Sequence, residues 1–141
     1  MAQFPSGYTF PVLNSDGTFS TTREDFADVF VRKELFLNSG LWSVGFNFKG
    51  ELGLGDVVHR SSPVQVGLLT NWKLVACGYN HTVSVKTDGT LWSVGMNNQG
   101  QLGLGDVVNR TSPVQVGLLT NWKQVSCGSY HTVAIDFAEI T

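Results

Sequence analysis

The chain repeats itself at an interval of 50 residues. Residues 41–83 align without gaps to residues 91–133; ten of these 43 positions differ, which leaves 33 identical. A fixed period of this length is typical of propellers and solenoids, in which each repeat is one supersecondary unit that packs against its neighbours. The repeat therefore restricts the fold more than any other feature of the sequence.

The pattern within one repeat length favours a propeller over a helical solenoid. Four segments have the length and composition of strands and are bounded by turn residues: 72–78, 81–87, 90–95 and 112–118. Asp88-Gly89 joins the second segment to the third and predicts a hairpin with a type I′ turn, which requires positive φ. Four strands per repeat correspond to one blade. We therefore expect an all-β fold of propeller-type four-stranded blades, about two per chain.

Four motifs of the repeat, taken together, resemble a known family. They are Leu-Trp-Ser-x-Gly from Leu91, Asn-x-x-Gly-Gln-Leu-Gly-x-Gly-Asp from Asn97, Ser-Pro-x-x-Val from Ser112, and Val-x-Cys-Gly-x-x-His-Thr from Val125. Residues 34–137 are on this basis similar to the regulator of chromosome condensation repeat family of β-propellers. The resemblance implies a ring that has seven blades in one chain in that family, whereas about two blades cannot close a ring alone.

The repeats do not account for the N-terminal residues. We expect a non-repeat N-terminal arm over residues 1–33 and two propeller-type repeats over residues 34–141, with periods 41–90 and 91–140. The arm is expected to combine an extended segment with a short helix, because Thr21 followed by Glu24 is a helix start signal. In its general sequence character this arm resembles the N-termini of structural proteins from marine bacteriophages. Candidate subunit contacts at the two ends of the chain are Phe4, Tyr8, Phe10, Phe26, Phe30, Phe137 and Ile140.

A partial propeller predicts association, because it leaves sheet edges and apolar blade faces without a neighbour. We expect a homo-oligomer in which head-to-tail contacts between copies complete the ring. Two, three or four chains would give about four, six or eight blades, within the range known for propellers. We favour a trimer, because three-fold symmetry is common in phage fibres and spikes. The alternative is that proteins of another kind complete the sheets.

No residue pattern indicates catalysis, a cofactor or a metal. The glycines of the stretch from Gly50 to Asp56 lack the Lys-Ser/Thr of a phosphate-binding loop and are expected to permit tight turns. The pairs Cys77–His81 and Cys127–His131 would lie in separate blades, so we interpret them as small buried thiols and backbone-bonded imidazoles.

Other repeated residues have structural interpretations. Asp56 with Arg60, and their repeats Asp106 and Arg110, are expected to form local ion pairs that hold a long loop. The two repeated pairs of tryptophans are expected to pack blade against blade: Trp42, Trp72, Trp92 and Trp122.

Charge and hydropathy exclude several classes of protein. The net charge of −2 argues against nucleic-acid binding, which usually needs a basic stripe. No segment reaches the length of about 18 apolar residues that a membrane span requires, so we expect no membrane insertion. The N-terminal residues lack the basic and apolar regions of a signal peptide. We therefore expect a virion protein, or otherwise a cytoplasmic one, and no secretion by a signal peptide.

The positions that differ between the repeats indicate where a partner binds, because a constant scaffold with variable loops is typical of a binding surface. Simple drift is the alternative explanation. The candidate partner-binding residues are Phe46, Phe48, Lys49, Glu51, His59, Tyr79 and Asn80 in the first repeat, and Met96, Asn98, Gln99, Gln101, Asn109, Ser129 and Tyr130 in the second.

The sequence thus predicts a non-enzymatic structural or interaction protein. We expect an oligomeric, propeller-like assembly, as a tail, fibre or decoration component of a bacteriophage virion that binds other proteins or a host surface. The alternative is a regulatory module that resembles the family's guanine-nucleotide exchange factors for small GTPases. That activity needs a complete propeller and a protruding wedge, and no insertion in the repeats resembles such a wedge.

Overall fold

The computed structural model describes residues 12–13, 19–20 and 39–138. The chain divides into two units, Met1–Leu37 and Asn38–Thr141. In the first unit, β1 (Val12–Leu13) pairs with β2 (Phe19–Ser20) in antiparallel fashion. The predicted short helix lies outside the described residues, as do these candidate subunit contacts: Phe4, Tyr8, Phe10, Phe26, Phe30 and Ile140.

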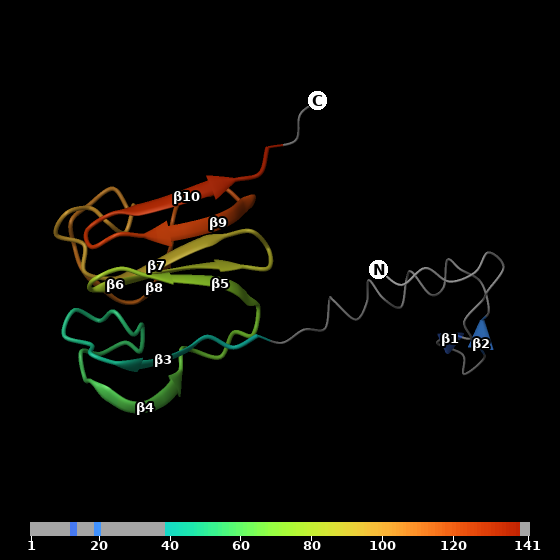
Figure 1. Ribbon diagram of the computed structural model, residues 1–141, viewed down its shortest axis with the longest axis horizontal. Coiled ribbons are helices and arrows are strands. Elements are labelled where there is room, and N and C mark those ends of the chain that lie inside the picture. The colour runs from blue at the N-terminus through green and yellow to red at the C-terminus, as the bar shows by residue number, and fades with distance from the viewer. Residues whose placement is uncertain (1–11, 14–18, 21–38, 139–141) are drawn as a thin grey trace. The chain divides into compact units, whose positions relative to one another are not determined.

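The second unit is a series of antiparallel sheets, drawn one above another in Figure 1. A complete four-stranded blade is formed in chain order by β5 (Trp72–Cys77), β6 (His81–Lys86), β7 (Leu91–Gly95) and β8 (Arg110–Gln115). On either side lies a two-stranded half-blade: β3 (Trp42–Gly45) with β4 (Arg60–Gln65), and β9 (Trp122–Cys127) with β10 (Thr132–Asp136). The prediction of four-stranded blades, about two per chain, is confirmed.

The hairpin between β6 and β7 forms where the Asp-Gly signal predicts it, but its turn type differs. The N–H of Gly89 donates to the carbonyl of Lys86 at 3.0 Å, and Gly89 is the residue with positive φ (81°), whereas no described residue other than glycine has positive φ. A type I′ turn would need positive φ at Asp88 as well, so that prediction is wrong. Asp88 instead accepts hydrogen bonds from the N–H and hydroxyl of Thr90, at 3.0 and 2.6 Å, which hold it in its turn.

The core lies between the complete blade and the β9–β10 half-blade. Val83, Val85 and Leu91 of the complete blade are fully buried, since alternate strand residues point to one face of a sheet. Partly buried side chains pack against them, mostly from the half-blade: Val116, Trp122, Val125, Cys127 and Ala134. Neighbouring sheets are therefore held face to face by apolar packing.

The same hydrogen bond joins neighbouring sheets at two successive places. The hydroxyl of Thr82 in β6 donates to the carbonyl of Glu51 at 2.9 Å, and its repeat Thr132 in β10 donates to the carbonyl of Gln101 at 2.8 Å. Nε2 of the buried His81 also lies 3.1 Å from the hydroxyl of Thr132. These side chains set the spacing between blades.

The tryptophans make two kinds of contact, one between neighbouring sheets and one within a single sheet. Trp122 packs on the core of the complete blade, as predicted for blade-to-blade packing. Trp72 and Trp92, however, contact each other edge to face within the complete blade, with ring centroids 6.2 Å apart. The buried ammonium of Lys86 lies 4.8 and 3.6 Å from their respective centroids. The prediction was therefore incomplete, because it did not consider contacts across one sheet.

The burial of His81 predicts a pH dependence of stability. Desolvation lowers the pKa of His81 from its ordinary value of 6.5, so the unfolded chain binds the proton more readily than the folded chain. Stability should therefore be highest above pH 6.5 and should fall as the pH drops below that value. Denaturant unfolding at a series of pH values from 8 to 5 would measure this fall, and the His81→Gln variant should show a smaller one. An unchanged slope in the variant would contradict the assignment.

Candidate partner-binding face

Four loops meet at one end of the sheets. The register of the complete blade pairs His81 with Gly95 and Gly95 with Arg110, which places the start of β6, the end of β7 and the start of β8 together. The first half-blade pairs Gly45 with Arg60 in the same way. The loops at these ends are residues 46–59, 78–80, 96–109 and 128–130, and we call the surface that they form the loop face. It lies at the left in Figure 1.

Each long loop is built around a buried asparagine. The side-chain amide of Asn97 donates to the carbonyl and to Oδ1 of Asp106, both at 3.0 Å, and its Oδ1 accepts from the N–H of Leu102 at 3.0 Å. Asn47 makes the equivalent contacts with Asp56 and Leu52 in the first repeat. Both asparagines are fully buried, so the centre of each loop is fixed by satisfied polar groups.

The predicted ion pairs close the same loops. Arg60 contacts Asp56, and Arg110 contacts Asp106, with a nitrogen–oxygen distance of 2.6 Å in each pair. The N–H of Val58 and the guanidinium of Arg60 hold the pKa of Asp56 below its ordinary value. Hydrogen bonds from Arg110 and Val108 lower the pKa of Asp106 in the same way. Both carboxylates are therefore charged at neutral pH and hold their loops without serving as acids.

The glycines of the long loops have the structural role that the sequence predicted. Gly50 has a φ of 80°, and a Cβ there would lie 2.8 Å from Cα of Thr111, in the neighbouring blade. A side chain at this position would be strained and would push the loop away from the complete blade.

Most of the fourteen predicted binding residues lie on the surface of the loop face. Nine are exposed: Phe46, Phe48, His59, Tyr79, Asn98, Gln99, Asn109, Ser129 and Tyr130. Lys49, Asn80 and Met96 are half-buried. Glu51 and Gln101 are buried, and each accepts a hydrogen bond from a backbone N–H two residues earlier in its own loop. These two residues build the loop, so their assignment to a binding surface was wrong.

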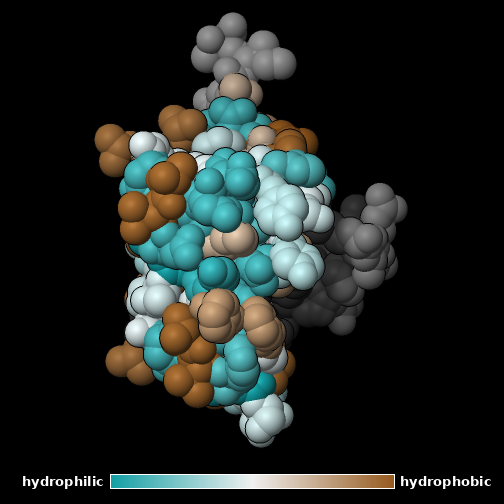
Figure 2. All heavy atoms as spheres, turned by 90° about the vertical axis from the view of Figure 1, so that its left-hand side faces the viewer, coloured by the Kyte–Doolittle hydropathy of each residue, from teal (hydrophilic) through white to brown (hydrophobic). Residues whose placement is uncertain are grey.

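The exposed residues divide into groups of different chemistry. Phe46 stacks on His59 with ring centroids 4.7 Å apart, and Phe48 lies 6.3 Å from Phe46. At the equivalent positions the second repeat presents Met96, Asn98 and Asn109. Tyr79 and Tyr130 form a further aromatic pair at 6.1 Å. Figure 2 views the molecule from this side and shows hydrophobic side chains in several patches among hydrophilic ones.

Sequence reasoning missed a set of apolar residues at the tips of the long loops. Val57 and Val58, and their repeats Val107 and Val108, are all exposed. They were overlooked because they are identical in the two repeats, and only the differing positions were considered. The signal was present in the sequence as an apolar pair directly after the loop aspartate.

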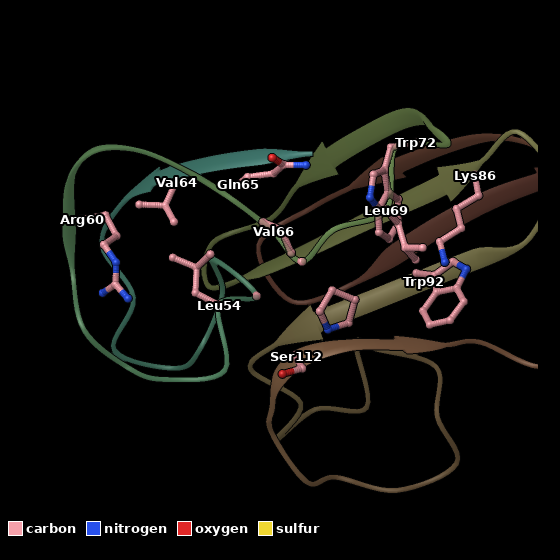
Figure 3. Close-up of a pocket in the computed structure, with 13 residues that line it drawn as sticks. Leu54, Arg60, Val64, Gln65, Val66, Leu69, Trp72, Lys86, Trp92 and Ser112 are labelled. Carbon is pink, nitrogen blue, oxygen red and sulfur yellow. The ribbon is translucent and has the colours of Figure 1, made fainter. Parts of the chain in front are cut away.

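Two clefts lie between neighbouring sheets of the second unit. One of about 390 Å³ lies between the first half-blade and the complete blade, where Figure 3 shows Arg60 and Lys86 among largely apolar side chains. A second, of about 360 Å³, lies between the complete blade and β9–β10. The lining of the first contains Arg60, Lys86 and Ser112 but no carboxylate, histidine or cysteine, whereas the second is lined in part by Tyr130 and His131.

The cysteines and histidines also form no metal-binding cluster among the described residues. Burial raises the pKa of the Cys127 thiol, whereas Cys77 is exposed. The prediction of buried thiols is therefore wrong for Cys77 and holds only in part for Cys127, which is half-buried. The imidazole of His81 lies 3.1 Å from the side-chain hydroxyl of Thr132, and it is the main-chain carbonyls of His81 and His131 that accept from the N–H groups of Gly78 and Gly128.

Comparisons with known proteins agree with this architecture. The family model described as the regulator of chromosome condensation (RCC1) repeat matches residues 38–85 and 88–135, and a second model with that description matches residues 72–101. The chain belongs to the regulator of chromosome condensation repeat family. Its RCC1 repeats cover most of the described residues, and the resemblance inferred from the motifs is confirmed. A comparison with curated protein sequences finds no match.

Several solved structures share the RCC1 fold. Human WBSCR16 is 25% identical over 70% of this chain and 27% of its own, with a TM-score of 0.60. Yeast RCC1 (Prp20), in a structure with Kap60, is 25% identical over 69% of this chain and 26% of its own, with a TM-score of 0.62. Prp20p from Saccharomyces cerevisiae, described with its binding to Gsp1p and histones, is 21% identical over 72% and 28%, with a TM-score of 0.58. The chain thus spans about a quarter of the length of these propellers.

Because the buried asparagines build the long loops, substitutions at two neighbouring residues should differ greatly in their effect on stability. Asn97→Ala should destabilise the chain by about 2–3 kcal/mol, because it leaves the N–H of Leu102 buried without its acceptor. The exposed neighbour Asn98→Ala should change stability by less than about 0.5 kcal/mol. Denaturant unfolding of both variants measures this, and equal effects would contradict the proposed construction of the loop.

Proposed function

We propose that the chain is a non-enzymatic protein-interaction module, which binds a protein partner through its loop face and assembles with further copies of itself. The observation that carries this proposal is the loop face: exposed aromatic and aliphatic side chains stand on loops whose backbones are fixed by buried polar contacts. Fixed loops lose little conformational entropy on binding, and aromatic residues are enriched in binding surfaces. Among related propellers, yeast RCC1 has been seen with Kap60 bound to it.

A non-enzymatic role is supported by the lining of the first cleft. Enzymes usually place titratable groups in a cleft where neighbours shift their pKa values. The cleft beside the first half-blade contains Arg60 and Lys86 as its charged residues. Arg60 bonds to Asp56 and Lys86 lies over two tryptophan rings, so both cations already have structural contacts.

Self-assembly is supported by the count of strands. The second unit contains one complete blade and two half-blades, which together supply about two blades toward a ring of about four to eight. Copies of the chain arranged in a ring would complete both half-blades. Of the small rings we favour the trimer, which would have about six blades. Of the predicted subunit contacts, Phe137 is described and exposed, as expected of a residue that would be covered in an assembly.

The setting that we propose is a bacteriophage virion, with the chain as a tail, fibre or decoration component that binds other structural proteins or a host surface. This part of the proposal rests on the resemblance of the aromatic N-terminal arm to phage structural proteins. Detection of the chain by mass spectrometry in purified particles would support it. A chain confined to the host cytoplasm would contradict it.

A regulatory module for small GTPases is the second candidate. Prp20p has been described with its binding to Gsp1p, and it shares the fold of this chain. Against this candidate, the two described long loops, 46–59 and 96–109, have the same length, and neither carries an insertion that would form a wedge. Acceleration of GDP release from a GTPase that binds the chain would favour this candidate over the first.

The loop-face proposal can be tested with residues that the scaffold already accepts. The triple variant Phe46→Met/Phe48→Asn/His59→Asn gives the first repeat the side chains that the second repeat has at the same positions. The fold should be unchanged, because the second repeat forms the same loop with these residues. Proteins retained by the immobilised wild-type chain from its native host, identified by mass spectrometry, should bind the variant at least tenfold more weakly.

The matched control lies at the opposite end of the sheets. Leu68 is almost fully exposed in the segment that joins β4 to β5, away from the loop face. Leu68→Ser should leave partner binding unchanged. Equal loss in the control and the triple variant, or no loss in the triple variant, would contradict binding through the aromatic cluster of the first repeat.

A further inference from the structure

The two half-blades lack complementary strands. Within the described part of the chain, β3 pairs with β4 alone and β10 pairs with β9 alone. In the complete blade the equivalent strands, β7 and β6, pair with each other. The partner missing from β3 is therefore a strand of the β6 type, and the partner missing from β10 is a strand of the β7 type.

Side-chain exposure shows what these missing partners leave uncovered. Val94 in β7 is 4% exposed, whereas its repeat Val44 in β3 is 49% exposed. In β6, Val83 and Val85 are 1% and 0% exposed, whereas Val133 and Ile135 at the equivalent positions of β10 are 57% and 55% exposed. In the complete blade the faces that carry Val83 and Val85 are covered by the neighbouring β9–β10 half-blade, so the difference shows that the half-blades lack a neighbouring blade as well as their missing strands. Both edges present apolar side chains together with unpaired backbone groups, which favours strand addition.

We propose that β10 of one copy pairs with β3 of the next copy, so that each junction between copies is a complete four-stranded blade in the order β9–β10–β3–β4. This inference deepens the self-assembly part of the proposed function and rests on it. The second copy is the occupant that the sequence favours, because the β6-type motif His-Thr-Val occurs twice in the chain, and the first occurrence is already paired within the complete blade.

The complete blade also fixes the register of the junction. In it, Val83 pairs with Ser93 and Val85 pairs with Leu91. When β10 takes the place of β6, and β3 of the next copy takes the place of β7, Val133 pairs with Ser43 and Ile135 pairs with Leu41 of that copy. The residues of β3 and its lead-in, 41–45, are identical to residues 91–95, so the receiving edge is the one that β6 already fits.

The strands of the junction closely match those of the complete blade. They differ at six positions, where the junction has Ser61, Gln124, Ser126, Ala134, Ile135 and Asp136. The junction would also bring together Trp122 and Trp42, the repeats of the contacting pair Trp72 and Trp92. Asp136 replaces Lys86, so the cation over those rings is absent at the junction. The junction should therefore be weaker than the complete blade, as a reversible contact would be.

This pairing is between copies and not within one chain. The two half-blades lie on opposite sides of the complete blade, with β10 at the top and β3 at the bottom of Figure 1. Each junction uses unlike surfaces of the two copies, so the assembly closes into a ring when the rotation per copy divides a full turn. Each copy adds about two blades to that ring.

Cysteine pairs test the register directly. In a Cys77→Ser/Cys127→Ser background, Leu41→Cys and Ile135→Cys are made on separate chains and mixed under mild oxidation. A disulfide-linked dimer should form, because directly opposed Cβ atoms are about 4.5–5.5 Å apart, near the spacing that a disulfide bridges. The register control mixes Leu41→Cys with Val133→Cys, where the diagonal distance of about 7–8 Å is too long. Dimer yield on a non-reducing gel should be at least tenfold lower for the control.

Each other outcome has a distinct meaning. Equal yields from the two mixtures, or no disulfide in chains that light scattering shows to be oligomers, would overturn the β10–β3 register while leaving self-assembly intact. No disulfide in chains that remain monomers would overturn both. Neither result depends on the loop face, whose triple variant tests partner binding separately.

Discussion

The need to pair strand edges is the constraint on which the architecture depends. An exposed edge presents unpaired backbone donors and acceptors, which favour addition of another strand. Each of the two aligned repeats opens with a strand of the β7 type, which is the third strand of a blade. The sequence repeats are therefore offset from the blades by half a blade. The offset gives the second unit two unlike half-blades that complement each other. Repeats in register with the blades would have given two complete blades and no reason for this particular contact.

The same construction separates the scaffold from the surface. Thr82 and Thr132 hold neighbouring sheets together at equivalent points, and buried Asn47 and Asn97 hold the long loops. Because these contacts do not involve most of the exposed side chains that differ between the repeats, such as Phe46, Phe48 and Tyr79, those side chains can vary at little cost to folding. An assembly of copies would repeat the loop face around a ring, which multiplies weak contacts with a partner through avidity.

Much of the fold could be predicted from the sequence, because repetition exposes the pattern twice. The blade, the ion pairs and the glycine turns followed from spacing and residue type, and most of the variable positions lie exposed on the loops. The turn at Asp88 could not be distinguished by the Asp-Gly pair alone, since two turn types use it. Glu51 and Gln101 were misplaced because variation between repeats does not show burial. Trp72 and Trp92 meet across β6, a contact that depends on strand order and not on spacing.

The most direct test of self-completion is the solution mass of the intact chain, measured by light scattering behind size exclusion over a range of concentrations. We expect one discrete species at two, three or four times 15.4 kDa, approached as the concentration rises. A chain that stays at 15.4 kDa at every concentration would contradict it, because both half-blade edges would then remain unpaired by a second copy.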